Sequence, residues 1–172
     1  SNSAKEILLS IYIKKVELIY NGISNINNYK KISAQKEYVI TVANLSLRKG
    51  YFEYLEIIER VIKEFPDTKF LFLGYDNLNG KVQKLIKEKS LSSNVKYLGF
   101  KENIGDYLAE SKFFVLPSLY GEGCPTSILE AFKLNLSSYF LWCFISLIPL
   151  FLSELVSFRS INLNIFSLIC TK

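Results

Sequence analysis

Between residues 38 and 133, short runs of consecutive apolar residues alternate with amphipathic segments, and this alternation limits the folds open to the chain. Apolar runs rich in β-branched and aromatic residues are typical of strands buried on both faces. Strands joined by helices through short connections favour a parallel sheet covered on both sides, so we predict an α/β fold. The predicted strands are residues 38–43, 69–74, 95–100 and 113–116.

The predicted helices fill the segments between these strands. Apolar residues recur at three- and four-residue spacing from Phe52 to Phe65, which predicts an amphipathic helix that ends before Pro66. Shorter helices are predicted around residues 82–86 and 104–109. Because ligands of such sheets bind beyond the carboxyl ends of the strands, we expect the site in the segments that leave those ends. These segments are residues 44–50, 74–76, 99–102 and 117–125.

The composition excludes several classes of chemistry. The chain of 172 residues has no histidine, which removes Ser-His-Asp and Cys-His catalysis and the commonest metal ligand. Its three cysteines form no Cys-x-x-Cys pair, so neither a disulfide scaffold nor a metal site is predicted, and a cytoplasmic location is expected. The net charge of +5 is spread over lysines mixed with acidic residues, and no nucleic-acid-binding motif accompanies it. We therefore expect no nucleic-acid partner.

Residues 117–132 hold the strongest functional pattern, in which Glu122 and Glu130 are separated by seven residues. A predicted strand leads into this stretch and a predicted helix begins within it. A helix that starts after a tight turn at a strand end offers its N-terminus to an anion, while nearby carboxylates can accept hydrogen bonds from sugar hydroxyls. The pattern therefore indicates a nucleotide-sugar site. The alternative is an ordinary helix start with surface glutamates.

The turn between the two glutamates supplies the groups that would meet the anion. Backbone N–H groups around Gly123, Cys124 and Thr126 are predicted to point at a diphosphate. Glycine lets the phosphate approach the backbone closely, and Pro125 in the first helical turn loses no intrahelical hydrogen bond. Cys124 has no histidine to activate it as a nucleophile, so we interpret it as a small residue packed in the turn.

Two further strand ends carry candidate residues. Lys49 follows a predicted strand and precedes a helix, where a cation can meet phosphate; Arg48 has the same option, and a solvated basic loop is an equal alternative. Gly74 could admit a base or a ribose, or could simply form a turn. The chain lacks the G-x-G-x-x-G and P-loop motifs and an Asp-x-Asp pair, so nothing supports a nicotinamide, a flavin or a metal-bridged diphosphate.

Taken together, these stretches resemble the C-terminal, donor-binding domain of GT-B glycosyltransferases, a large retaining group that includes transferases of lipopolysaccharide and capsule synthesis. The two glutamates separated by seven residues are the best-known mark of that family. The resemblance implies a Rossmann-like parallel sheet flanked by helices, which is one half of a GT-B fold. It rests on residues 17–23, 42–50, 70–74, 95–100 and 114–132, about two thirds of the chain.

The resemblance also implies a role for each site residue. Glu122 would contact hydroxyls of the transferred sugar, Glu130 would contact the ribose, and Lys49 would neutralise the leaving diphosphate. The substrate would be a nucleoside diphosphate sugar, with no cofactor and no metal. The implied partners are an acceptor glycan or lipid-linked sugar, and an N-terminal acceptor domain supplied by another chain.

The sequence departs from the family pattern at three places. Asn44 stands where Arg is frequent, and Cys124 stands where Phe is usual. After Phe132 nothing matches the expected Gly-x-Pro-Val strand, so we predict an incomplete donor-binding domain at residues 1–133 and a separate apolar tail at 134–172. Because the chain begins Ser-Asn-Ser, we expect it to be processed, tagged or cut from a longer protein.

Three interpretations of the tail remain open at this point. Residues 134–153 carry no charge and are long enough to span a membrane, which would anchor the protein there or hold it at the membrane surface. The tail could instead form a buried or interfacial helix, or it could be an out-of-frame translation, which we favour because the family pattern stops inside a helix.

Three functions are compatible with the sequence. The first is donor binding for retaining hexosyl transfer in bacterial-type surface polysaccharide synthesis. The alternatives are an inactive or membrane-associated remnant, and a sugar-nucleotide epimerase of similar fold, for which the chain offers no histidine as an acid or base.

Overall fold

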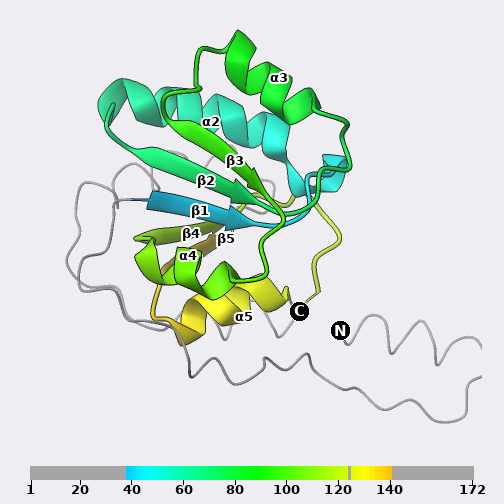
Figure 1. Ribbon diagram of the computed structural model, residues 1–172, viewed down its shortest axis with the longest axis vertical. Coiled ribbons are helices and arrows are strands. Elements are labelled where there is room, and N and C mark those ends of the chain that lie inside the picture. Colours follow the sequence, from blue (N-terminus) through cyan, green and yellow to red (C-terminus); the bar gives the residue numbers. More distant parts are fainter. Residues whose placement is uncertain (1–37, 124, 141–172) are drawn as a thin grey trace, which may run out of the picture.

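The computed structural model describes residues 38–123 and 125–140, and within them five strands form a single sheet (Figure 1). The strands lie in the order β3-β2-β1-β4-β5, and every neighbouring pair is parallel. The predicted Rossmann-like α/β fold is therefore confirmed, and the four predicted strands lie within one residue of their expected bounds. The strands are β1 (Tyr38–Val42), β2 (Lys69–Leu73), β3 (Val95–Gly99), β4 (Phe113–Leu116) and β5 (Ser137–Phe140).

Helices connect consecutive strands and cover both faces of the sheet. α2 and α3 pack on one face, while α4 and α5 pack on the other (Figure 1). α2 ends just before Pro66, as the sequence predicts, because the residue that precedes a proline disfavours the helical conformation. The helical elements of the described residues are η1 (Leu47–Lys49), α2 (Tyr51–Glu64), α3 (Lys81–Glu88), α4 (Ile104–Glu110) and α5 (Thr126–Lys133).

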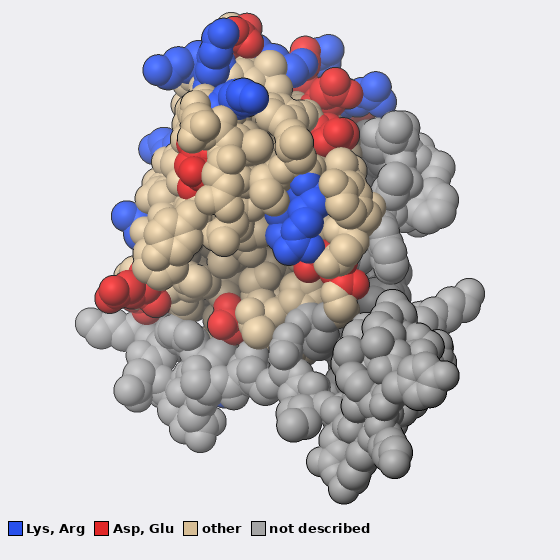
Figure 2. Space-filling view, turned by 90° about the vertical axis from the view of Figure 1, so that its right-hand side faces the viewer, with Lys and Arg blue, Asp and Glu red and all other residues tan. Residues whose placement is uncertain are grey.

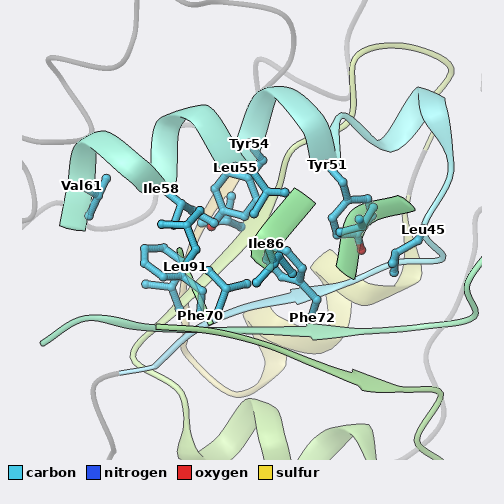
Figure 3. Close-up of a cluster of buried hydrophobic side chains, with 14 of the residues drawn as sticks. Leu45, Tyr51, Tyr54, Leu55, Ile58, Val61, Phe70, Phe72, Ile86 and Leu91 are labelled. Atoms are coloured by element: carbon cyan, nitrogen blue, oxygen red, sulfur yellow. The ribbon is translucent and has the colours of Figure 1, made fainter. Parts of the chain in front are cut away.

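The core beneath α2 combines aromatic and aliphatic side chains (Figure 3). Phe70 and Phe72 of β2 are fully buried, and Tyr54 of α2 packs on both, with ring centroids 6.2 and 5.8 Å away. Successive side chains of a strand point to opposite faces, so Leu71 and Leu73 of the same strand join the other core, beneath α4 and α5. Each fully buried large side chain stabilises the fold by about 1.5–3 kcal/mol. Because apolar side chains lie on both faces of these strands, helices pack on both sides of the sheet.

The fifth strand is the main feature that the sequence analysis did not predict. α5 ends in a Schellman motif, in which Leu136 N–H donates to Ala131 O at 3.0 Å and Asn135 N–H donates to Phe132 O at 2.9 Å. Asn135 adopts the left-handed conformation with φ +55°, which turns the chain back toward the sheet. β5 then runs parallel to β4, with Phe113 opposite Ser137. The sheet thus extends beyond residue 133, where we expected the domain to end.

Most of the predicted tail, residues 141–172, lies outside the described residues, so its three interpretations stay open. Within residues 38–123 and 125–140, no helix has the length and apolar character required to cross a membrane.

A turn built around Asp76 connects β2 to α3. Its carboxylate accepts hydrogen bonds from Leu78 N–H and Gly80 N–H, each at 2.8 Å, and from Gln83 Nε2 at 3.0 Å. Burial raises the pKa of Asp76, but these three hydrogen bonds favour the charged form and leave the pKa below its ordinary value of 3.8. A depressed pKa means that the stabilisation is present above 3.8 and is lost as the pH falls through the lower folded value.

We therefore expect Asp76→Ala to lower the free energy of unfolding by about 1–2 kcal/mol at neutral pH, because it removes the acceptor of three hydrogen bonds. Urea denaturation at neutral pH and near pH 3 measures the effect, and the gap between the wild type and the variant should narrow in acid. Asp67→Ala, at an exposed aspartate before β2, is the matched control. A gap that does not change with pH would contradict a role for the charged carboxylate.

Candidate functional site

The strand order places a topological switch point between β1 and β4. From β1 the chain proceeds outward to β2 and β3, then returns to the other side of β1 with β4 and β5. In open α/β sheets, ligands bind where the connections leave the carboxyl ends of the two central strands in opposite directions. Here those connections are residues 43–50 after β1 and residues 117–125 after β4, at the right-hand edge of the sheet in Figure 1.

These two connections are held together by hydrogen bonds. Leu119 N–H donates to Arg48 O at 2.8 Å, and the Arg48 guanidinium donates to Gly121 O at 2.8 Å. Gly50 has φ +62°, and a Cβ at this position would lie 2.2 Å from Pro117 O. The close approach of the two connections therefore requires glycine at residue 50.

Three side chains from the two connections approach the same oxygen of Glu122. The Lys49 ammonium forms an ion pair with Glu122 Oε1, Ser118 Oγ donates to the same atom at 2.9 Å, and the Arg48 guanidinium lies 3.6 Å from it. The side chains of Lys49 and Glu122 are only 11% and 9% exposed, whereas that of Arg48 is 45% exposed. Two cations and one carboxylate leave an excess of one positive charge.

The surface around this cluster also carries exposed basic atoms. Figure 2 faces the carboxyl edge of the sheet and shows basic atoms in the middle of that face, surrounded mainly by uncharged surface, with acidic atoms close by. At the upper end of the molecule, where α3 lies in Figure 1, basic and acidic side chains are mixed. This mixture is typical of a solvated helix face and not of a patch of one sign.

The second glutamate of the motif lies on α5. Burial of the Glu130 carboxyl raises its pKa, and no side chain of the described residues forms a hydrogen bond or ion pair with it. Pro125 directly precedes the first helical residue, Thr126, and Gly123 is exposed. Cys124 lies outside the described residues, so the proposed anion contact of the amides from Gly123 to Thr126 stays a prediction.

Two predicted residues, Gly74 and Asn44, already have partners within the protein. Gly74 has φ +143°, and a Cβ there would lie 2.2 Å from Ala43 O, so packing alone requires this glycine. The Asn44 side chain accepts a hydrogen bond from Tyr75 N–H at 3.0 Å, which ties the connection after β1 to the one after β2. Their predicted contacts with the nucleotide stay predictions.

Sequence reasoning missed two features of this edge. Ser118 is fully buried, and its hydroxyl donates a hydrogen bond to Glu122. The sequence signal for Ser118 was its place just after a predicted strand. Tyr75 and Phe100 stack with ring centroids 4.4 Å apart and remain 54% and 47% exposed. The signal for this pair was an aromatic residue after each strand-end glycine.

The site offers both cations and carboxylates. Lys49, Arg48 and the N-terminus of α5 can stabilise an anion, and Glu122 and Glu130 can accept hydrogen bonds from hydroxyl groups. In the part of the chain that the structure describes, no three Cys, Asp or Glu side chains are grouped so that they could hold a metal ion.

The chain matches the model of one protein family and is similar to several known proteins. Residues 23–137 match the model of the family described as glycosyl transferases group 1. The match extends past Phe132, where the sequence analysis placed its end. Among curated proteins, the chain is 34% identical over 108 residues to an uncharacterized glycosyltransferase of Methanocaldococcus jannaschii. It is also 35% identical over 143 residues to the capsular polysaccharide biosynthesis glycosyltransferase CapH of Staphylococcus aureus.

The chain corresponds to only part of these relatives. The alignments cover 63% and 78% of this chain but 26% and 39% of the two proteins. A crystal structure of Staphylococcus aureus TarM with Fondaparinux, alpha-GlcNAc-glycerol and UDP matches with a TM-score of 0.69 and 25% identity, over 79% of this chain and 27% of that chain.

The C-terminal domain of a group 1 glycosyl transferase (LpcC) from Francisella tularensis matches with a TM-score of 0.52. The alignment has 20% identity and covers 62% of this chain and 59% of that chain. Identity this low shows the fold alone, and the fold is that of a C-terminal domain. The expected half of a GT-B fold is thereby confirmed.

Proposed function

Because this chain belongs to the glycosyl transferases group 1 family, we propose that its described domain binds a nucleoside diphosphate sugar. The donor would serve a retaining hexosyl transfer in bacterial-type surface polysaccharide synthesis. The observation that carries the proposal is the cluster of Lys49, Arg48 and Glu122 at the switch point between β1 and β4. This cluster combines cations for a diphosphate with a carboxylate for sugar hydroxyls.

The relatives support this choice of ligand and pathway. CapH is described as a glycosyltransferase of capsular polysaccharide biosynthesis, and the TarM crystal structure contains UDP. For this chain, an acceptor glycan or lipid-linked sugar is part of the proposal. Because the chain spans less than half the length of the curated relatives it matches, acceptor binding and transfer are proposals for the domain acting together with an acceptor-binding domain.

The proposed mechanism depends on stabilising the leaving group. Negative charge develops on the diphosphate as the bond between the sugar and the phosphate breaks, and preorganised positive groups stabilise that charge. Lys49 and Arg48 would lie on one side of the diphosphate, and the N-terminus of α5 would add the partial positive charge of the helix dipole.

The two glutamates would hold the donor at either side of the diphosphate. Glu122 would accept hydrogen bonds from hydroxyls of the sugar, while Glu130 would accept them from the ribose. The half-buried position of Glu130 supports the second role, because a desolvated carboxylate without a protein partner gains most from a ligand donor.

The proposal is tested by titrating the full chain with UDP, GDP, ADP and dTDP, using calorimetry and thermal melting. We expect one diphosphate to bind and to stabilise the fold by about 2.7 kcal/mol at a hundredfold excess over its Kd. Glu130→Ala should abolish the thermal stabilisation, because the ribose loses its acceptor. Glu130→Gln keeps the shape and should weaken binding by about tenfold.

Glu88→Gln on α3 is the control, since that exposed glutamate forms an ion pair with Lys84 of its own helix, away from the site. Burial raises the pKa of Glu130, so its carboxylate becomes protonated earlier as the pH is lowered. The affinity for the diphosphate should therefore begin to fall on acidification while the pH is still above the ordinary glutamate value of 4.5. The absence of a thermal shift with all four diphosphates would refute donor binding.

A further inference from the structure

Among the described residues, every donor to the Glu122 carboxylate approaches the same oxygen. Lys49, Ser118 and Arg48 all approach Oε1, and no described residue donates a hydrogen bond to Oε2. A carboxylate held at one oxygen keeps its second oxygen as an acceptor for a ligand. The partners of Oε1 therefore determine where Oε2 can meet a ligand hydroxyl.

The three partners of Oε1 differ in what a ligand would do to them. If a diphosphate binds as proposed, it competes with Glu122 for Lys49 and for the half-exposed Arg48, since both cations would contact phosphate oxygens. Ser118 has no such competitor, because its side chain is neutral and 0% exposed. Its hydrogen bond is the contact that can persist while both cations turn to the phosphates.

Ser118 also lies in a buried part of the chain. It follows Pro117 directly after β4, the central strand next to β1, and both residues are buried. Glu122 lies four residues later in a connection that is itself tied to residue 48. A donor fixed at the end of a buried strand can define the orientation of a carboxylate on a more exposed loop.

We propose that Ser118 is a positioning residue that orients the Glu122 carboxylate, and so sets the affinity of the site for the transferred sugar but not for the nucleotide. This inference rests on the proposed function. Loss of the hydroxyl would leave Oε1 to Lys49 and Arg48 alone, and the carboxylate would follow those cations toward the diphosphate. Oε2 would then no longer face the sugar.

The test compares the nucleoside diphosphate with its sugar conjugates by calorimetry on the full chain. The probes are UDP, UDP-glucose, UDP-galactose and UDP-N-acetylglucosamine, or GDP and GDP-mannose if GDP binds more tightly. For Ser118→Ala, we expect the Kd of the best sugar conjugate to rise about tenfold, the loss typical of one hydrogen bond to a charged group. The Kd of the free diphosphate should stay within about twofold, because Lys49 and Arg48 remain.

Ser111→Ala is the matched control. Ser111 is also 0% exposed, and its hydroxyl donates to Tyr107 O at 2.7 Å, so the variant loses a buried hydrogen bond away from Glu122. It should leave both affinities unchanged. Ser118→Cys keeps nearly the same shape with a weaker donor, and it decides the question by the same measurement if Ser118→Ala does not fold.

Two results would overturn the inference. If Ser118→Ala weakens the diphosphate and the sugar conjugate by the same factor, the residue is merely structural. If neither affinity changes, Ser118 does not orient Glu122 for the sugar. A wild-type chain that binds none of the diphosphates refutes the proposed function instead, so the two failures are distinguishable.

Discussion

Gly74→Ala is expected to lower the free energy of unfolding by about 4 kcal/mol or more, which is a large part of the stability of a small domain. Gly74 has φ +143°, a conformation that L residues rarely adopt. A Cβ at this position would lie 2.2 Å from Ala43 O and 2.9 Å from Asn44 N, and both are backbone atoms that cannot turn aside. The variant must therefore separate the ends of β1 and β2 at the edge that carries the site.

Gly80→Ala is the matched control for this prediction. Gly80 also has a positive φ, +79°, but a Cβ there meets nothing within 4 Å. This variant should cost only about 1 kcal/mol, the strain of the left-handed conformation alone. Urea denaturation of the three proteins, followed by circular dichroism, measures both effects. Equal losses for the two variants would show that strain, and not the contact with Ala43, makes glycine necessary at residue 74.

Lys49→Met is expected to lower the free energy of unfolding by about 2–3 kcal/mol and to weaken diphosphate binding by about 10- to 100-fold. The side chains of Lys49 and Glu122 are almost buried, so the variant leaves a desolvated carboxylate that, of the described side chains, Ser118 and the more distant Arg48 still approach. The same substitution removes a cation proposed to meet the diphosphate. Stability and ligand affinity should therefore fall together.

A double-mutant cycle with Glu122→Gln separates the ion pair from other effects of each substitution. Once the carboxylate is neutral, the loss of Lys49 should cost clearly less, with a coupling free energy of about 1–3 kcal/mol. Lys84→Met, at an exposed lysine of α3, removes the same charge at a distance and should change neither property. Additive losses in the cycle would mean that the Lys49–Glu122 pair does not stabilise the protein.

Most of the fold could be predicted because it depends on local patterns. The runs at residues 38–42 and 69–73 are mostly apolar, and in the structure their apolar side chains alternate between two separate cores. The spacing from Phe52 to Phe65 likewise corresponds to α2 (Tyr51–Glu64). The short length of these runs and their β-branched and aromatic residues identify strands, while the three- and four-residue spacing identifies helices.

The fifth strand could not be predicted in the same way. We expected a glycine at the turn before another strand, whereas Asn135 adopts the left-handed conformation with φ +55°. Asparagine does so at a moderate cost because its side chain is short and polar. The two backbone hydrogen bonds of the Schellman motif then fix the turn, and they leave no mark in the pattern of apolar residues.

The chemistry at the strand ends came from the sequence, whereas its arrangement came from the tertiary structure. Residue types and spacing identified Lys49 and the two glutamates as candidates, because cations and carboxylates at strand ends favour an anionic, hydroxyl-bearing ligand. The contact of Lys49 and Ser118 with the same oxygen of Glu122 depends on β4 lying beside β1. Strand order follows from long-range packing, which brings together groups 73 residues apart that no local pattern can connect.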